Sequence, residues 1–276
     1  MKYSKLLLGA IALGFSSFAP AQIVINVSGN YSQTFDSLPL SGTANTWTDN
    51  STLAGWYADR EIGGEISVLS AGTGSSTTTA LYSFGSTSAT DRSLGALSSG
   101  SSNAFAYGVV FQNASAQTMT FTDFSYRGEL WRMGSPAQFE TLEFAYRISS
   151  TPITSGLTGT WIDANDLDFT SASSSAPSGA TGAVDGNLVG NFTVLNATLS
   201  LVLDPGSYLM FRWYDIDHES ADNGLGIDNV SISYVSASTP PPFITAVPEP
   251  STYGILGAVG LIGAALWRRR RPISDL

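Results

Sequence analysis

The chain contains no cysteine, and His218 is its single histidine among 276 residues. Disulfide bonds are therefore excluded, and the fold must rely on its hydrophobic core. A zinc site of the usual nitrogen and sulfur ligands is nearly excluded for the same reason. Hydrophobic residues, at 43%, include 14 Phe, 11 Tyr and 6 Trp, which are enough to build such a core.

Basic side chains are scarce between residues 22 and 250. This part of the chain has no lysine and 6 arginines against 21 acidic groups, a net charge of −15. A surface this acidic repels phosphate backbones, so we expect no nucleic-acid partner. It is compatible with divalent cations or neutral glycans.

The N-terminal end has the pattern of an export signal. Lys2 and Lys5 precede the apolar residues 6–18, which an Ala-Pro-Ala cleavage pattern follows. This order predicts a secretory signal peptide over residues 1–21, with signal peptidase and the general export machinery as partners. The mature chain is then expected to begin near Gln22.

The C-terminal end, residues 247–271, has three parts in fixed order: a Pro-Glu-Pro turn, an uncharged run at 253–267 and four arginines. At 1.5 Å per residue the run reaches about 22 Å, short against the roughly 30 Å of a hydrocarbon core. Trp267 and the arginines would complete the span at the interface, and basic flanks stay on the cytoplasmic side. The residues of the turn and of the basic flank are Pro248, Glu249, Pro250, Arg268, Arg269, Arg270 and Arg271.

This tail resembles the PEP-CTERM sorting signal of Gram-negative bacteria. The resemblance implies that an exosortase is a partner, that the Pro-Glu-Pro motif marks the processing site, and that the arginines stop transfer. The helix at 253–267 would hold the precursor in the inner membrane transiently, with residues 272–276 as a cytoplasmic tail. The product would then reach the cell surface or the extracellular matrix. An ordinary single-span anchor would share the apolar run and the arginines but would not explain the Pro-Glu-Pro motif.

Between the two ends, short runs with a period of two predict strands, and helical periodicity is almost absent. The clearest alternation is Glu140 to Ile148. In the run 118–126 the apolar side changes phase at Asp123, which predicts a β-bulge. Asp204-Pro205-Gly206 predicts a turn. The other predicted strands are 22–27, 31–35, 104–111, 191–195, 199–203, 208–214 and 227–235.

Many short strands with polar turns and no alternation with helices predict an all-β fold. We expect one β-sandwich of the jelly-roll type over residues 22–235. Residues 236–246, with three consecutive prolines, are expected to form a stiff linker before the sorting tail.

A second resemblance covers most of residues 30–235. The successive motifs F-D-S-L-P, L-A-G-W-Y, Y-S-F-G-S-T with D-R-S-L-G, S-Y-R-G-E-L-W-R and G-L-G-I-D-N-V-S-I begin at Phe35, Leu53, Tyr82, Ser125 and Gly224. Together they resemble jelly-roll, lectin-like modules of exported bacterial proteins. The resemblance implies a fold and a cellular location rather than a reaction.

An acidic loop near the C-terminal end of the sandwich is the first candidate site. Clustered oxygen ligands with glycines for tight turns are what calcium requires, but the spacing departs from an EF-hand loop after Asp217. The alternative is a solvated loop without a cation, and no other cofactor is expected. The candidate calcium ligands are Asp215, Asp217, Asp222 and Asp228, with Glu219 and Asn223 in the same stretch.

The second candidate is a ligand-binding face formed by Arg127, Glu129, Trp131 and Arg132. On a strand the first three share one face, where an aromatic ring beside a charged pair can stack on a sugar. The alternative is structural: Trp131 fills the core and Glu129 pairs with an arginine.

Catalysis is the less favoured interpretation. His218 lacks a nucleophile elbow of the G-x-S-x-G type, so no catalytic residue is predicted. A glycosidase-type pair of carboxylates among Glu129, Glu140 and Glu143 stays open as an alternative. We therefore expect an exported, non-enzymatic binding or structural protein. The resemblance of its tail implies an association with exopolysaccharide, and the rival is a matrix-acting hydrolase.

Overall fold

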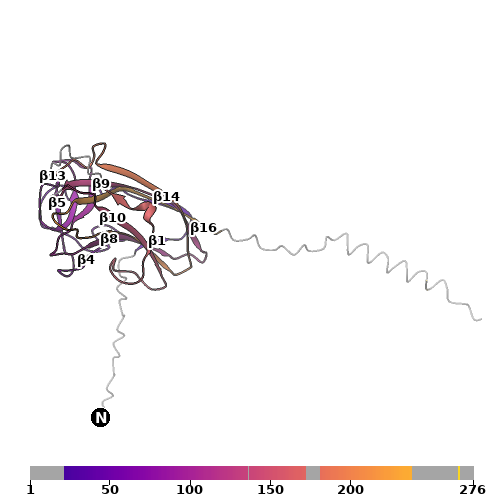
Figure 1. The fold of residues 1–276 in the computed structure, drawn as a ribbon. Coiled ribbons are helices and arrows are strands. Elements are labelled where there is room, and N and C mark those ends of the chain that lie inside the picture. The colour runs from indigo at the N-terminus through magenta and orange to yellow at the C-terminus, as the bar shows by residue number, and fades with distance from the viewer. Residues whose placement is uncertain (1–21, 136, 172–180, 238–266, 268–276) are drawn as a thin grey trace, which may run out of the picture. The chain divides into compact units, whose positions relative to one another are not determined.

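The computed structural model describes residues 22–135, 137–171, 181–237 and Trp267. Within residues 22–237 the chain forms two β-sheets that enclose one main core (Figure 1). The expectation of an all-β sandwich is confirmed. A single short 3₁₀ helix, η1 (Asn165–Leu167), lies among the described strands.

The first sheet has the order β1-β8-β15-β10-β11, with β4 also paired to β8 and β12 to β10. Apart from β1, which runs parallel to β8, its pairs are antiparallel. Its strands are β1 (Ile23–Ile25), β4 (Trp56–Arg60), β8 (Phe105–Asn113), β10 (Thr141–Ser149), β11 (Ile162–Asp163), β12 (Phe169–Thr170) and β15 (Tyr208–Asp215).

The second sheet has the order β13-β9-β16-β7-β6-β5-β3, with β14 also paired to β9 and β2 to β16. Here β5 and β6 are parallel. Its strands are β2 (Gly29–Gln33), β3 (Asn45–Thr46), β5 (Val68–Gly72), β6 (Ala80–Phe84), β7 (Ser93–Leu97), β9 (Met119–Met133), β13 (Gly182–Ala183), β14 (Phe192–Leu203) and β16 (Gly224–Ser236).

Aromatic side chains from both sheets form the centre of the core. Phe124 of β9 meets Phe144 of β10 and Phe211 of β15, with ring centroids 4.8 Å apart in each case. Trp213 of β15 stacks on Trp56 of β4 at 5.7 Å. Aromatic pairs of this kind stabilise the fold beyond the free energy gained from burying their apolar surface, so they hold the two sheets together.

The predicted bulge in β9 is confirmed. Phe121 pairs with Tyr234 of β16 and Asp123 with Ser233, so β9 carries one extra residue between the two pairs. The extra residue allows Phe121 and Phe124 both to point into the core, while Asp123 is exposed. The phase change in the sequence therefore has this structural cause.

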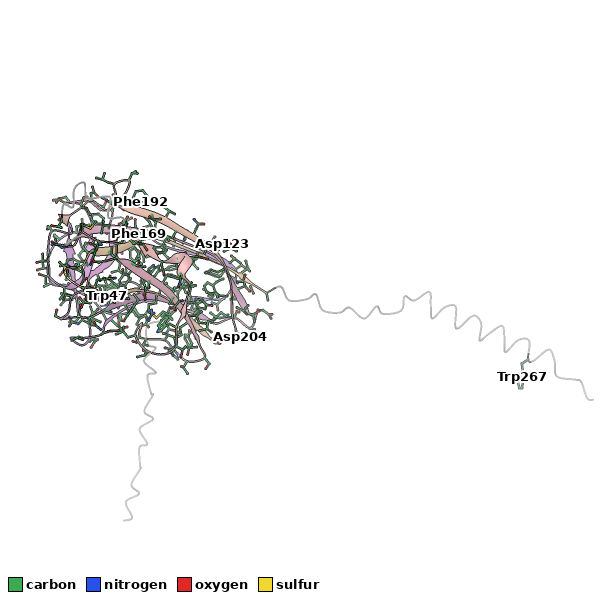
Figure 2. All side chains as sticks on the ribbon, viewed as in Figure 1. Trp47, Asp123, Phe169, Phe192, Asp204 and Trp267 are labelled. Atoms are coloured by element: carbon green, nitrogen blue, oxygen red, sulfur yellow. The ribbon has the colours of Figure 1, made fainter. Side chains whose placement is uncertain are left out.

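Other strand predictions are confirmed with shifted ends. The runs 191–195 and 199–203 form one strand, β14, whose pairing with β9 is irregular between Thr198 and Leu201. The turn at 204–206 joins β14 to β15 and begins at the exposed Asp204 (Figure 2).

Strands β4 to β7 were not predicted from periodicity. All five residues of β7 are buried, as are four of the five in β6. A strand covered on both faces loses the alternation that marks a half-exposed strand. The stretch 70–79 is rich in serine and threonine, yet its first three residues belong to a strand, because β5 continues to Gly72.

The targeting segments lie outside the described residues. This holds for the predicted signal peptide at 1–21, for 238–246 of the linker, and for the sorting tail apart from Trp267. Among the residues that the structure describes, no helix has the length and apolar character to cross a membrane.

A glycine on the inner face of β9 generates a stability prediction. A Cβ placed on Gly128 would lie 2.2 Å from Cγ and 2.7 Å from Cβ of Phe169, so rotating the ring cannot relieve the clash. We expect Gly128→Ala to lower the free energy of unfolding by about 1–3 kcal/mol, as measured by urea denaturation. Gly72→Ala is the matched control, since its Cβ would meet Tyr82 at an ordinary 3.4 Å. Equal stability of the two variants would contradict this packing.

Candidate functional site

The outer face of the second sheet carries a small aromatic cluster. The rings of Tyr82 and Phe84 stack at 4.8 Å, and Phe84 stacks on Trp131 at 6.1 Å. Together with Leu97 they form a core separate from the main one. Gly186 lies over the indole, because a Cβ on it would be 2.5 Å from Trp131 Cε2. Trp131 is consequently 1% exposed.

Glu129 lies beside this cluster and is also 1% exposed. Its Oε2 accepts a hydrogen bond from Trp131 Nε1 at 2.8 Å, and its Oε1 lies 2.9 Å from Arg127 Nε. Burial raises the pKa of Glu129 to about 7, although the Arg127 charge and the indole hydrogen bond oppose the shift. Desolvation is thus the larger effect here.

Arg127 connects this acid to the surface. Its guanidinium donates to Asn187 Oδ1 at 2.8 Å and lies 3.8 Å from the centre of the Phe192 ring. As the sequence predicted, Arg127, Glu129 and Trp131 share one face of β9. Arg132 belongs to a different contact, since it donates to the Gly74 carbonyl at 3.0 Å.

Asp228 of β16 belongs to the Glu129 cluster. It is 1% exposed and accepts hydrogen bonds from the backbone and side-chain amides of Asn229 at 2.6 and 2.7 Å. Burial, together with the nearby Glu129 charge, raises the pKa of Asp228 to about 8. The structure therefore separates Asp228 from the other candidate calcium ligands.

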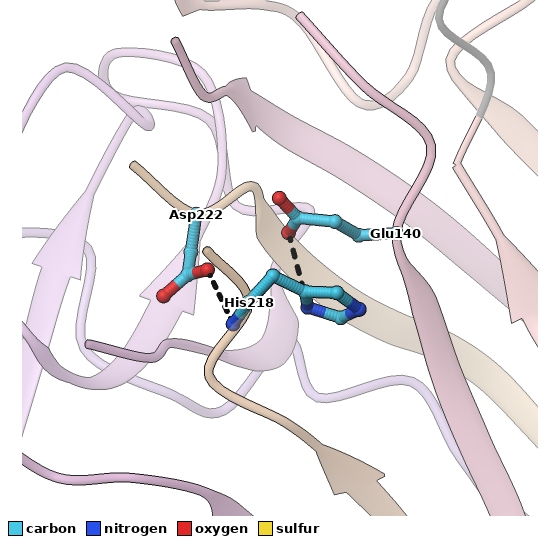
Figure 3. Close-up of side chains that lie close together, drawn as sticks. All are labelled: Glu140, His218 and Asp222. Carbon is cyan, nitrogen blue, oxygen red and sulfur yellow. Dashed lines mark hydrogen bonds and ion pairs between the residues drawn. The ribbon is translucent and has the colours of Figure 1, made fainter. Parts of the chain in front are cut away.

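A second group of acids gathers where three segments meet: Glu140 before β10, the loop between β15 and β16, and the loop after β7. A carboxylate oxygen of Glu140, one of Asp222 and a ring nitrogen of His218 lie within 4.8 Å of one another (Figure 3). Asp215 adds a buried carboxylate, which accepts a hydrogen bond from Ser98 at 3.0 Å. We call Glu140, Asp215, Asp217 and Asp222 the acidic cluster.

Hydrogen bonds fix most atoms of the acidic cluster. The Asn223 amide donates to Glu140 Oε2 at 2.7 Å, and the His218 amide donates to Asp222 Oδ1 at 2.9 Å. Burial raises the pKa of Glu140 and raises that of Asp222 to about 7. Burial also raises the pKa of Asp215 well above its usual range, and the other three carboxylates raise it further.

Sequence reasoning placed Asp215, Asp217 and Asp222 together but did not place Glu140 with them. Glu140 lies 75 residues before Asp215, and only the antiparallel pairing of β10 with β15 brings the two strands together. Asn223 is fully buried and holds the Gly134 amide through Oδ1 at 2.7 Å, so its role there is structural.

The cluster of Glu129 and Asp228 generates a pH prediction. Their pKa values are higher in the folded than in the unfolded chain, so the folded state binds more protons, and stability falls as pH rises from the ordinary values of 4.5 and 3.8 to the folded values of about 7 and 8. Between pH 5 and 7 we expect Glu129→Gln to reduce the slope of the unfolding free energy against pH by about 1.4 kcal/mol per pH unit, which corresponds to one proton. Urea unfolding at pH 5, 6, 7 and 8 measures it. The exposed Glu65→Gln serves as control, and equal slopes for both variants would contradict the prediction.

Comparisons with known proteins identify the C-terminal tail. A search of curated proteins gives no match. Two solved adhesin domains of Lys-gingipain are similar. The K3 domain from Porphyromonas gingivalis has 13% identity and a TM-score of 0.37, and the match covers 67% of this chain and 95% of that one. The K2 domain has 14% identity and a TM-score of 0.38, and the match covers 74% of this chain and 97% of that one. At these TM-scores the likeness supports no inference. The model of the PEP-CTERM protein-sorting motif matches residues 246–271, so the chain carries this motif, which implies an exported protein sorted by an exosortase.

Proposed function

We propose that this protein is an exported β-sandwich that an exosortase processes and delivers to the cell surface or the extracellular matrix. There it acts as a non-catalytic binding or structural component associated with exopolysaccharide. The observation that carries the proposal is the sorting motif at residues 246–271, which follows the sandwich in the sequence. The signal peptide at 1–21 and the transient membrane helix at 253–267 belong to the same proposal, as does a jelly-roll arrangement of the sheets.

The outer face of the second sheet supports a structural role for its acids. Glu129 is enclosed by its contacts with Arg127 and Trp131, and Asp228 is held by the amides of Asn229. A glycosidase needs two carboxylates that flank a sugar in an accessible cleft. Both acids here are 1% exposed, which favours a scaffold over an active site.

A binding function has a structural candidate next to this face. Trp131 borders a shallow cleft of about 310 Å³, and the hydroxyls of Thr73, Ser86 and Thr87 line it. The same three residues border a neighbouring cleft of about 400 Å³ that extends toward Arg92. Hydroxyl-lined surfaces bind neutral polar ligands such as glycans through hydrogen bonds, and this continuous surface suits an extended polymer better than a small molecule.

The sorting motif is tested by fractionating cells of the source bacterium. We expect wild-type protein at the surface or in the medium, and a Pro248→Ala/Glu249→Ala variant retained in the inner membrane. A Pro240→Ala/Pro241→Ala variant is the control, because it changes the linker and leaves the motif intact. If the motif variant distributes like the wild type, the tail is an ordinary anchor and the proposal fails.

The choice between binding and hydrolysis is tested on exopolysaccharide from the same cells. We expect the wild-type protein to sediment with the polymer and to release no reducing sugar. Thr87→Trp should weaken sedimentation several-fold by filling the hydroxyl-lined cleft, whereas the exposed Asp123→Asn should not. Reducing sugar that appears with wild type and disappears with Glu129→Gln would instead establish the hydrolase.

A further inference from the structure

The acidic cluster concentrates negative charge at one end of the sandwich. Burial and mutual repulsion act on Asp215, while Asp222 is 5% exposed. His218 is the one basic group with an ion-pair contact to the cluster among the described residues, and its Nδ1 lies 4.0 Å from Glu140 Oε2. Carboxylates brought together in this way need a compensating positive charge.

One buried oxygen in this cluster lacks a partner. Oδ1 of Asp222 accepts from the His218 amide, but Oδ2, also buried, has no hydrogen-bond partner among the described residues. The Asp217 carboxylate lies within hydrogen-bonding range of Asp222. A proton on Asp222 can bridge the two groups, but two ionised carboxylates have no hydrogen to donate, so a cation can take the place of that proton once both are charged.

A cleft lies beside Asp222. Asp222 borders a cleft of about 210 Å³ that the hydroxyls of Thr77, Ser98 and Ser99 also line. Arg132 borders the cleft too, but its guanidinium bonds the carbonyls of Gly74 and Ser75. The cleft offers space and polar partners for water molecules that would complete a coordination shell.

We propose that the acidic cluster is a calcium site, with Asp217, Asp222 and Glu140 supplying carboxylate oxygens and water the remaining ligands. Asp215 is buried and belongs to the same cluster, and a bound cation would favour its ionised form. Oxygen ligands from separate segments suit Ca²⁺, which accepts six to eight ligands in irregular geometry. A zinc site of the usual kind fits poorly, because it needs several nitrogen or sulfur ligands and the chain has one histidine and no cysteine.

Such an ion would join two parts of the chain that lie far apart in the sequence and would sit near a third. Glu140 directly precedes β10, Asp217 and Asp222 belong to the loop before β16, and Gly100 of the loop after β7 lies near Asp217 Oδ2. A calcium ion here would stabilise the end of the sandwich without a disulfide. This proposal goes beyond the binding function and does not depend on it.

Calcium binding is tested on the full chain in a mild detergent at pH 7.5. We expect the melting temperature to be about 5–10 °C higher with CaCl₂ at a hundredfold excess over Kd than with EGTA, and a smaller rise with MgCl₂. Titration of CaCl₂ alone should give one site per chain. Asp222→Asn should abolish both signals.

The variants separate loss of the site from loss of the fold. In Asp222→Asn the side-chain oxygen would still accept a hydrogen bond from the His218 backbone amide, and the side-chain NH₂ could donate one to Asp217. In EGTA this variant should therefore melt at or above the wild-type temperature. Asp123→Asn, exposed on β9, is the control and should keep the calcium response. Equal melting of wild type in CaCl₂ and EGTA would overturn the proposal, as would a response that survives in Asp222→Asn. Neither result would affect the sorting experiment.

Discussion

The pairing of β9 with β16 along almost the whole length of both strands is the interaction on which the rest of this structure depends. β9 is 15 residues long and buries side chains on both of its faces. Its inner face supplies Phe121, Phe124 and Leu130 to the core between the sheets, and its outer face supplies Glu129 and Trp131 to the second, smaller core. A shift of β9 by one residue would turn Glu129 toward the main core and the aromatic side chains away from it. The register of the strand is therefore strongly specified.

The arginines of the sandwich are mostly committed to groups other than carboxylates. Arg92 is 2% exposed and bonds Ser83, Arg212 lies between the rings of Trp161 and Tyr214, and Arg132 bonds backbone carbonyls. Among the described residues, Arg127 forms the one ion pair between an arginine and a carboxylate. With six arginines and no lysine in residues 22–250, the acidic cluster must be neutralised by protons or by an ion from solution. On the outer face of the second sheet, Glu129 has Arg127 as its cationic partner. The acidic cluster has no such arginine among the described residues, so the two groups of buried carboxylates are neutralised in different ways.

The sequence predicted those features that local pattern controls. The phase change at Asp123 identified the bulge, and the alternation after Glu140 identified β10, because each of these strands has a side that is less buried. β6 and β7 escaped prediction because the aromatic cluster covers the face that would otherwise be polar. The shared face of Arg127, Glu129 and Trp131 followed from a period of two. The position of Glu140 beside Asp222 follows from pairing between distant strands, which no local pattern encodes.

The last strand links the fold to the sorting tail. β16 ends at Ser236, ten residues before the motif begins, yet it is an interior strand that pairs with β9, β7 and β2. The second sheet therefore cannot close until the final residues of the sandwich have crossed the membrane. An anchor that holds the chain for a time at this point would give β16 the opportunity to pair before release. A chain released earlier would expose the unpaired edges of β9 and β7, which are templates for aggregation. A central C-terminal strand is thus consistent with the temporary retention that we propose for the tail.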